Sequence, residues 1–321
     1  MSNNESFYYS ILARQSDSEW VKILDRLSPS IHPVDRRATR IWFAFFPVKL
    51  HNALTSSPDQ EETANQLLLK GKYRLIDQVD TSAEFLYGHR YWPEVKQEVA
   101  KYAMAAGIDG ELPERILEVA RQVAKTVKVD VSHVVSVTAV AFGTLQQVGP
   151  EIFNQPAQPG VYGKRWKKSP DQIVGERAKD DGQGIFGFLK TVDKEFSVNF
   201  REYEPGCRFK IVNMQDVTMA ATNDKRDHQM RDRRCMPGEG PIPVECRTSS
   251  CGTCWVGVLS PTEKVSPPGA REIGRWNYFG YEGFTGESDS PIRLACQIKA
   301  YGNVTIVIPP WNGMIGKLDE R

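Results

Sequence analysis

Apolar residues recur at helical spacing through the first half of the chain. Ser16 and Glu19 form a capping-box pattern, and an apolar stripe at i, i+3, i+4 and i+7 follows it. Pro93 and Pro113 stand where further amphipathic stripes begin, and proline suits the first turn of a helix. The pattern therefore predicts an all-helical domain over residues 1–153.

The most apolar stretch of this half is residues 134–148. Its short length and its hydroxyl and amide side chains, such as Thr144 and Gln147, argue against a membrane span. We expect a buried central helix, although the β-branched residues leave a strand open. Because the first residues also lack the basic and apolar regions of a signal peptide, we expect a cytoplasmic protein with no membrane span.

Residues 154–190 differ in composition from the sequence on either side. They are rich in proline and glycine and contain the basic run 164–168, and such a composition seldom packs a core. We interpret them as a solvated linker that joins two domains. The alternative is that the basic run is a strip on which a partner docks.

The hydrophobic period changes to two in the second half of the chain. Residues 195–200 and 207–212 alternate on either side of a Pro-Gly pair, which predicts a β-hairpin, and residues 304–308 form a further predicted strand. The predicted fold class is therefore α+β, with a β-rich second domain over residues 191–321.

Charge and cysteine usage narrow the possible functions. The chain of 321 residues has 41 Lys and Arg against 40 Asp and Glu, a formal charge of +1, so it lacks the basic excess of a nucleic-acid-binding protein. None of its six cysteines precedes Cys207. In a chain without an export signal this distribution favours metal ligation or free thiols over a disulfide framework.

Three cysteines lie in one loop with the pattern Cys-x4-Cys-x2-Cys, namely Cys246, Cys251 and Cys254, and Cys296 follows at a distance. Zinc sites usually use two separated pairs of cysteines, whereas this asymmetric spacing is typical of plant-type [2Fe–2S] centres. In such a loop, backbone N–H groups can point at the sulfurs and stabilise an anionic cluster. Gly252 lets the loop pass close to the cluster or adopt a positive φ.

Residues 194–310 resemble the plant-type and adrenodoxin-type [2Fe–2S] ferredoxin domains. The resemblance is carried by the loop 246–254, the predicted strand 255–259 and the segment Arg-Leu-Ala-Cys-Gln at 293–297. It implies a β-grasp fold and one-electron transfer between redox partner proteins, a reductase and an electron acceptor. The ligands that it implies for the cluster are Cys246, Cys251, Cys254 and Cys296.

The rest of the sequence indicates an electron carrier rather than an enzyme. Flavin and nicotinamide motifs are missing, and no pair of groups indicates acid–base chemistry. The alternatives are an iron–sulfur subunit of a larger oxidoreductase complex and a redox sensor. In each case we expect the helical domain to serve partner docking or association, either in a homo-oligomer or as part of a complex.

The region also departs from the ferredoxin pattern in three places. Ser249 stands where family loops often have glycine. Residues 272–290 make the stretch before the fourth ligand long and aromatic, and we expect them to shield the cluster or to form a docking surface. The insertion 223–243 is rich in arginine, and we expect a solvated loop.

Two cysteines lie outside the expected ligand set. Cys207 falls on a predicted strand, where we expect it to act as a small buried hydrophobe. Cys235 lies beside Arg233 and Arg234, which raises the alternative of a thiol with a lowered pKa and redox sensitivity.

Overall fold

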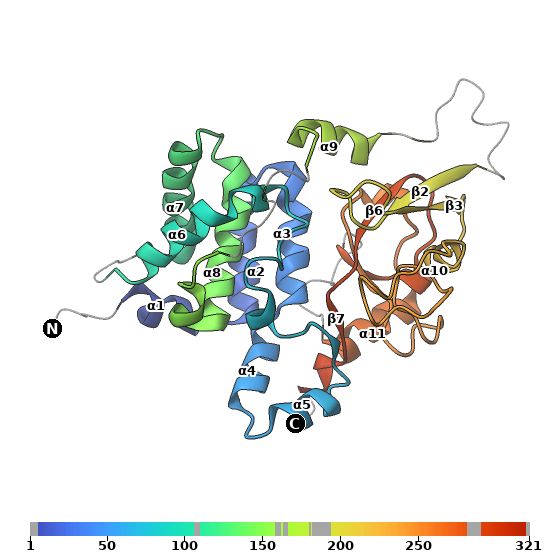
Figure 1. The fold of residues 1–321 in the computed structure, drawn as a ribbon, viewed down its shortest axis with the longest axis horizontal. Helices are drawn as coiled ribbons and strands as arrows, with labels where there is room; N and C mark the ends of the chain where they lie inside the picture. The colour runs from blue at the N-terminus through green and yellow to red at the C-terminus, as the bar shows by residue number, and fades with distance from the viewer. Residues whose placement is uncertain are drawn as a thin grey trace. The chain divides into compact units, whose positions relative to one another are not determined.

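The chain is a mixture of helix and sheet, with a helical N-terminal region and a C-terminal sheet, as predicted (Figure 1). The computed structural model describes residues 6–105, 110–157, 162, 166–179, 181, 194–280 and 290–318. It divides into two compact units. The helical unit comprises Met1–Asn52 and Arg74–Pro170, and the sheet unit comprises Ala53–Tyr73 and Asp171–Arg321.

The helical unit contains the amphipathic helices that the sequence predicts. Its main helices are α1 (Phe7–Ser10), α2 (Asp17–Leu27), α3 (Pro33–Phe45), α6 (Trp92–Ala103), α7 (Leu112–Val127) and α8 (Ser132–Phe153), while α4 (Val48–Ser56) runs on into the sheet unit. The predicted capping box of α2 is confirmed. Glu19 N–H donates to Ser16 Oγ at 3.3 Å, and the Glu19 carboxylate accepts Ser16 N–H at 2.6 Å.

Helix α8 is the centre of the helical unit and packs against α3, α6 and α7. The side chains from Val134 to Gln147 are all buried, which confirms the predicted central helix. The helix bends near its end, where Gly149 has a φ of 76° in front of Pro150. None of the helices in the described residues is long and apolar enough to cross a membrane.

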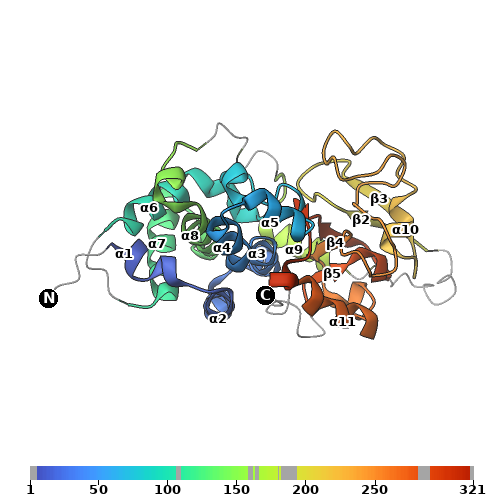
Figure 2. The ribbon, with the colours of Figure 1, turned by 90° about the horizontal axis from the view of Figure 1, so that it is seen from below.

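The sheet unit is built around a five-stranded sheet with the order β3-β2-β6-β4-β5. The strands are β2 (Glu195–Asn199), β3 (Arg208–Val212), β4 (Trp255–Val258), β5 (Ile292–Leu294) and β6 (Val304–Val307). β2 and β3 form the predicted hairpin, β2 and β6 are parallel, and the other pairs are antiparallel. Two helices accompany the sheet, α10 (Val217–Ala221) and α11 (Ala270–Phe279), and Figure 2 shows α11 beside β5.

A short piece of the N-terminal sequence belongs to the sheet unit. Strand β1 (Lys70–Gly71) pairs antiparallel with β7 (Trp311–Asn312), and α5 (Gln60–Gln66) precedes it. The sequence-based division at residue 153 differs here, because it placed residues 53–73 in the helical domain. A two-residue strand has no periodicity that a sequence can show, so only its distant partner reveals it.

The expected solvated linker contains an ordered helix, α9 (Pro170–Ala178). Ile173 is 2% exposed, and the Arg177 guanidinium forms a buried ion pair with Glu202 at 2.6 Å. The expectation of a solvated connector is therefore wrong for this helix. Much of the remaining linker lies outside the described residues, including most of the basic run 164–168, and so does the aromatic stretch at 281–289.

A candidate metal centre

The sheet brings the two cysteine-bearing segments together. Cys254 directly precedes β4, and Cys296 lies in the short 3-10 helix Ala295–Gln297 that directly follows β5. β4 and β5 are antiparallel with Trp255 opposite Leu294, so the start of β4 and the end of β5 lie side by side. The two cysteine-bearing segments therefore meet at this end of the strand pair. Ala295 N–H also donates to the carbonyl of Cys254 at 2.9 Å.

The cysteine loop, residues 246–254, turns tightly through left-handed backbone conformations. Arg247, Ser249 and Gly252 have φ values of 53°, 58° and 67°. The expected positive φ at Gly252 is confirmed, and a Cβ there would also lie 2.6 Å from the Phe279 ring. Ser249 also adopts the left-handed conformation, with its side chain buried.

Backbone amides of the loop converge on one sulfur. The N–H groups of Thr248, Ser250 and Cys251 donate to Cys246 Sγ at 3.4, 3.3 and 3.3 Å. Partial burial disfavours the thiolate, but hydrogen bonds from the Cys251 thiol and from Thr248 outweigh it and lower the pKa of Cys246 to about 6. The loop is therefore built to stabilise a negatively charged sulfur at this position.

The other two candidate ligands, Cys254 and Cys296, form a second pair of thiols. A hydrogen bond from the Cys254 thiol, with help from Gln297 and from Ser249 N–H, lowers the pKa of Cys296 to about 7. The same hydrogen bond, together with burial, raises the pKa of Cys254. Gln297 Nε2 lies 3.4 Å from Cys296 Sγ. A proton shared by the two thiols accounts for the opposite shifts.

All four predicted ligand cysteines thus lie in one neighbourhood. Cys246 acts electrostatically on Cys296, and Cys251 acts on Cys254, which links the two pairs. Cys254 and Cys296 are 2% and 6% exposed, whereas Cys246 and Cys251 are half-buried. Within the described ranges, no group of three or more His, Cys, Asp or Glu side chains is arranged to hold a metal ion. Their mutual hydrogen bonds group the four thiols into two adjacent pairs, Cys246 with Cys251 and Cys254 with Cys296.

Thr253 is a residue of the site that sequence reasoning missed. Its hydroxyl accepts Glu245 N–H at 3.1 Å and lies 3.1 Å from Cys251 Sγ. Either atom of this second contact can be the donor, and when Cys251 is a thiolate the Thr253 hydroxyl donates to its sulfur. In the sequence, Thr253 is a hydroxyl residue between two candidate ligands. Serine and threonine are so frequent near cysteines that this position alone does not indicate a role.

Glu272 is a second residue that sequence reasoning missed. It is fully buried in α11 and binds the Arg293 guanidinium through both carboxylate oxygens, at 2.9 and 2.8 Å. Its Oε1 also accepts Leu294 N–H at 2.7 Å. Because β5 leads directly into the turn with Cys296, Glu272 positions the strand that presents the fourth cysteine.

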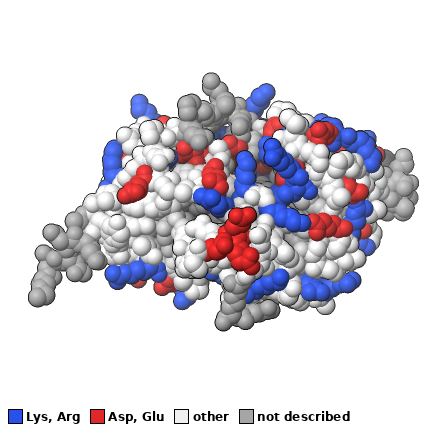
Figure 3. Space-filling view, turned by 60° about the horizontal axis from the view of Figure 1, so that its bottom comes forward, with Lys and Arg blue, Asp and Glu red and all other residues white. Residues whose placement is uncertain are grey.

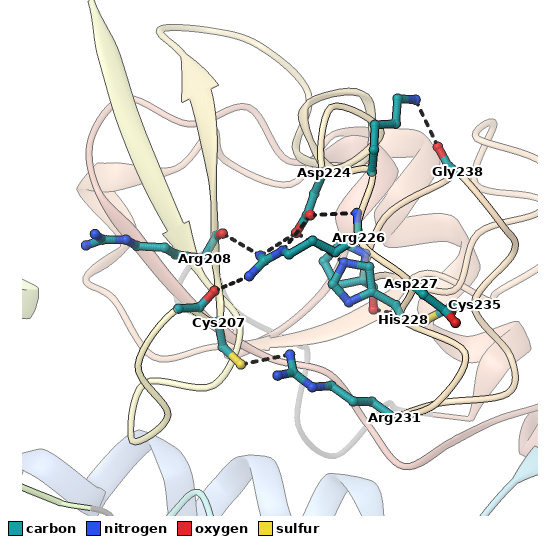
Figure 4. Close-up of polar contacts among 12 residues, drawn as sticks. Cys207, Arg208, Asp224, Arg226, Asp227, His228, Arg231, Cys235 and Gly238 are labelled. Atoms are coloured by element: carbon teal, nitrogen blue, oxygen red, sulfur yellow. Dashed lines mark hydrogen bonds and ion pairs between the residues drawn. The ribbon is translucent and has the colours of Figure 1, made fainter.

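The arginine-rich insertion 223–243 is not the solvated loop that we expected. Arg226 donates to the carbonyls of Gly206 and Arg208 at 2.6 and 2.9 Å and pairs with the buried Asp224 (Figure 4). In the same way Arg234 bonds Asp232, the carbonyl of Pro309 and Asn312. The arginines serve to fasten the insertion to the β2–β3 hairpin and to the end of the chain.

The two remaining cysteines are structural in this arrangement. Cys207 is 2% exposed, as expected, and its Sγ accepts a hydrogen bond from Arg231 at 3.0 Å (Figure 4). Burial, with the charge of Asp232, raises the pKa of Cys235 to about 12, and its thiol donates to the Pro241 carbonyl at 3.3 Å. The alternative of a lowered pKa at Cys235 is wrong, because burial and the charge of Asp232 outweigh the favourable charge of Arg234.

Comparison of the chain with known proteins gave no match. No family model, no curated protein and no solved structure matches it. The cysteine segments and the geometry around them therefore carry the information on function.

Proposed function

We propose that Cys246, Cys251, Cys254 and Cys296 hold a [2Fe–2S] cluster and that the protein is a ferredoxin-type one-electron carrier. The observation that carries the proposal is the meeting of these four sulfurs from two distant segments, with three amide N–H groups directed at Cys246. Thiolates are soft ligands that suit iron–sulfur clusters, and such a cluster supplies one-electron redox chemistry when it is bound.

The pairing of the thiols supports a two-iron centre. Cys246 and Cys251 are hydrogen-bonding neighbours, and so are Cys254 and Cys296. In a [2Fe–2S] cluster four thiolates are shared by two irons, so two adjacent pairs are the arrangement that the donor set requires. The low pKa of Cys246, about 6, favours the thiolate, which is the form that binds metal.

The order of the strands supports the β-grasp part of the proposal. Strands β2 and β6 come first and last along the chain among the five strands of this sheet, and they are parallel neighbours within it. β3 lies beside β2 on one side, and β4 and then β5 follow β6 on the other. Helix α10 follows the first hairpin, as the helix of a β-grasp domain does. The candidate site then lies in the connections that flank β4 and β5.

The surroundings of the cysteines suit electron exchange with another protein. Cys246 and Cys251 are half-buried and therefore partly accessible from solvent, while Cys254 and Cys296 are buried. Hydrogen bonds from backbone N–H groups and from Thr253 partly neutralise the negative sulfurs. Less negative sulfurs favour the reduced state, so these donors raise the reduction potential.

The proposal is tested by the metal content and spectra of the purified protein. We expect equal amounts of iron and acid-labile sulfide, visible absorption, and an EPR signal that appears on one-electron reduction near about −400 mV. Stoichiometric zinc without visible absorption in anaerobically prepared protein would refute the proposal.

Serine variants test which cysteines are the ligands. Serine at Cys246, Cys251, Cys254 or Cys296 should alter or abolish the cluster spectrum. The matched controls are Cys207→Ser and Cys235→Ser, since a serine hydroxyl can keep the hydrogen bonds with Arg231 and the Pro241 carbonyl. Loss of iron from a control variant, with iron retained by the Cys296 variant, would contradict the ligand assignment.

A further inference from the structure

Helix α11 contacts both cysteine-bearing segments with one face. Its buried Glu272 accepts Leu294 N–H at 2.7 Å, two residues before Cys296. Its buried Phe279 lies against Gly252 of the cysteine loop, since a Cβ on that glycine would be 2.6 Å from the ring. The two α11 residues are seven apart, which is close to two helical turns, so they lie on the same side of the helix.

Trp276 lies on this same face, between the two contacts. It follows Glu272 by four residues and precedes Phe279 by three, which are the spacings of residues that share one side of a helix. Like these two residues it is buried, with 4% of its surface exposed, whereas Ile273 and Tyr278 at other angles around the helix are exposed. Trp276 therefore belongs to the side of α11 that contacts the cysteine-bearing segments.

The indole N–H group of Trp276 is an unpaired donor. Its Nε1 atom is buried and has no hydrogen-bond acceptor in the described part of the chain. Buried donors in folded proteins are nearly always paired, so an unpaired one indicates an acceptor that the surrounding side chains do not supply. The surface gives no comparable signal, because basic and acidic side chains are interspersed on the face drawn in Figure 3.

We propose that the Trp276 N–H group donates a hydrogen bond to a sulfur of the proposed [2Fe–2S] cluster, either a sulfide or a cysteine thiolate. Both kinds of sulfur carry negative charge and accept hydrogen bonds from N–H groups. This inference rests on the proposed function and adds a side chain to the groups that tune the cluster. Of the two roles expected for the stretch 272–290, it favours shielding, because the aromatic residues Trp276 and Phe279 are both buried.

The reduction potential of the full-length protein reports the hydrogen bond. A donor to sulfur stabilises the reduced cluster more than the oxidised one, because the reduced cluster carries one more negative charge. Trp276→Phe removes the donor and keeps a buried aromatic ring, so the midpoint potential should move to a more negative value. Trp311→Phe is the matched control, since it makes the same change at a buried tryptophan of the same unit, and it should leave the potential unchanged.

Pulsed EPR of the reduced protein separates a hydrogen-bond donor from a tryptophan that only fills space. With the indole nitrogens labelled with nitrogen-15, a hydrogen bond to a cluster sulfur transmits an isotropic coupling between the labelled nitrogen and the unpaired electron. We expect this coupling in the unmodified protein and its loss in Trp276→Phe. Trp311→Phe should keep the coupling, and so should Trp255→Phe, although Trp255 directly follows Cys254.

Three results would overturn the inference. The first is a labelled, unmodified protein that holds the cluster and shows no isotropic nitrogen coupling, a result that does not depend on the folding of any variant. The second is a coupling that disappears in Trp255→Phe or persists in Trp276→Phe, and the third is an unchanged potential in Trp276→Phe with its iron and sulfide intact.

Each of these results would assign the Trp276 N–H group to another acceptor. The alternative acceptor is a buried water beside the 3-10 helix Ile315–Leu318, which also packs on α11. Failure of the proposed function is distinguishable, because the unmodified protein would then lack iron, sulfide and the EPR signal of the reduced cluster.

Discussion

Gly252 shows how one residue limits the shape of the cysteine loop. Its φ of 67° and the close approach of Phe279, whose ring would lie 2.6 Å from a Cβ at this position, are independent obstacles to any other residue. We expect Gly252→Ala to destabilise the sheet unit by about 2 kcal/mol or more and to lower its iron content. The measurements are the free energy of unfolding and iron per chain.

Gly274→Ala is the control for this substitution. Gly274 lies in α11 with open space around the Cβ position, so alanine there should stabilise the helix by up to about 1 kcal/mol. Equal destabilisation by both variants would show that the loop geometry is not the cause.

Glu272 is the residue on which the position of the fourth cysteine depends. It is 0% exposed and satisfies both Arg293 and Leu294 N–H, so Glu272→Gln leaves the Arg293 charge buried without its counter-charge. We expect a loss of about 3 kcal/mol or more in unfolding free energy, together with a shifted cluster spectrum. Glu263→Gln, at an exposed position, should change the stability by less than about 0.5 kcal/mol.

At the scale of elements, a buried ion pair and a buried apolar side chain of α9 give this helix a testable anchor. Arg177→Ala removes the partner of Glu202 and should loosen the helix, because the Glu202 carboxylate and the buried Arg177 guanidinium pair at 2.6 Å. Hydrogen–deuterium exchange should then become faster in residues 170–178 and stay unchanged in β4 and β6. Lys179→Ala, at an exposed residue just beyond the helix, should leave the exchange of α9 as it is, and accelerated exchange there would contradict this account.

At the scale of the whole molecule, removal of the proposed cluster should separate the behaviour of the two units. Metal binding is coupled to folding, so a chelator with a reductant should increase hydrogen exchange through the sheet unit. Residues 53–73 should follow the sheet unit, since β1 pairs with β7, although their neighbours in sequence belong to the helical unit. If residues 53–73 kept the protection of the helical unit instead, the division of the chain would be wrong.

Local patterns in the sequence were sufficient for the main elements and for the candidate ligands. The capping box at Ser16, the alternation on either side of the β-hairpin and the glycine of the cysteine loop each express a requirement of a few neighbouring residues. Such requirements leave a periodic or fixed spacing that can be recognised before any fold is known. The ligand assignment itself stays a prediction, supported by the meeting of the four sulfurs.

Tertiary structure decided the features that depend on partners far away in the chain. The sequence around Lys70 does not indicate that this residue pairs with Asn312 in a sheet. The sequence around Glu272 likewise does not indicate its ion pair with Arg293, and the sequence around Cys235 does not indicate that this thiol is buried. A charged residue or a thiol has the same sequence signature whether it is solvated, paired or buried, because its surroundings come from segments that folding brings together. The sequence by itself therefore determined the main helices, the β-hairpin and the cysteine spacing, and only the packing determined which distant segments and polar groups hold them in place.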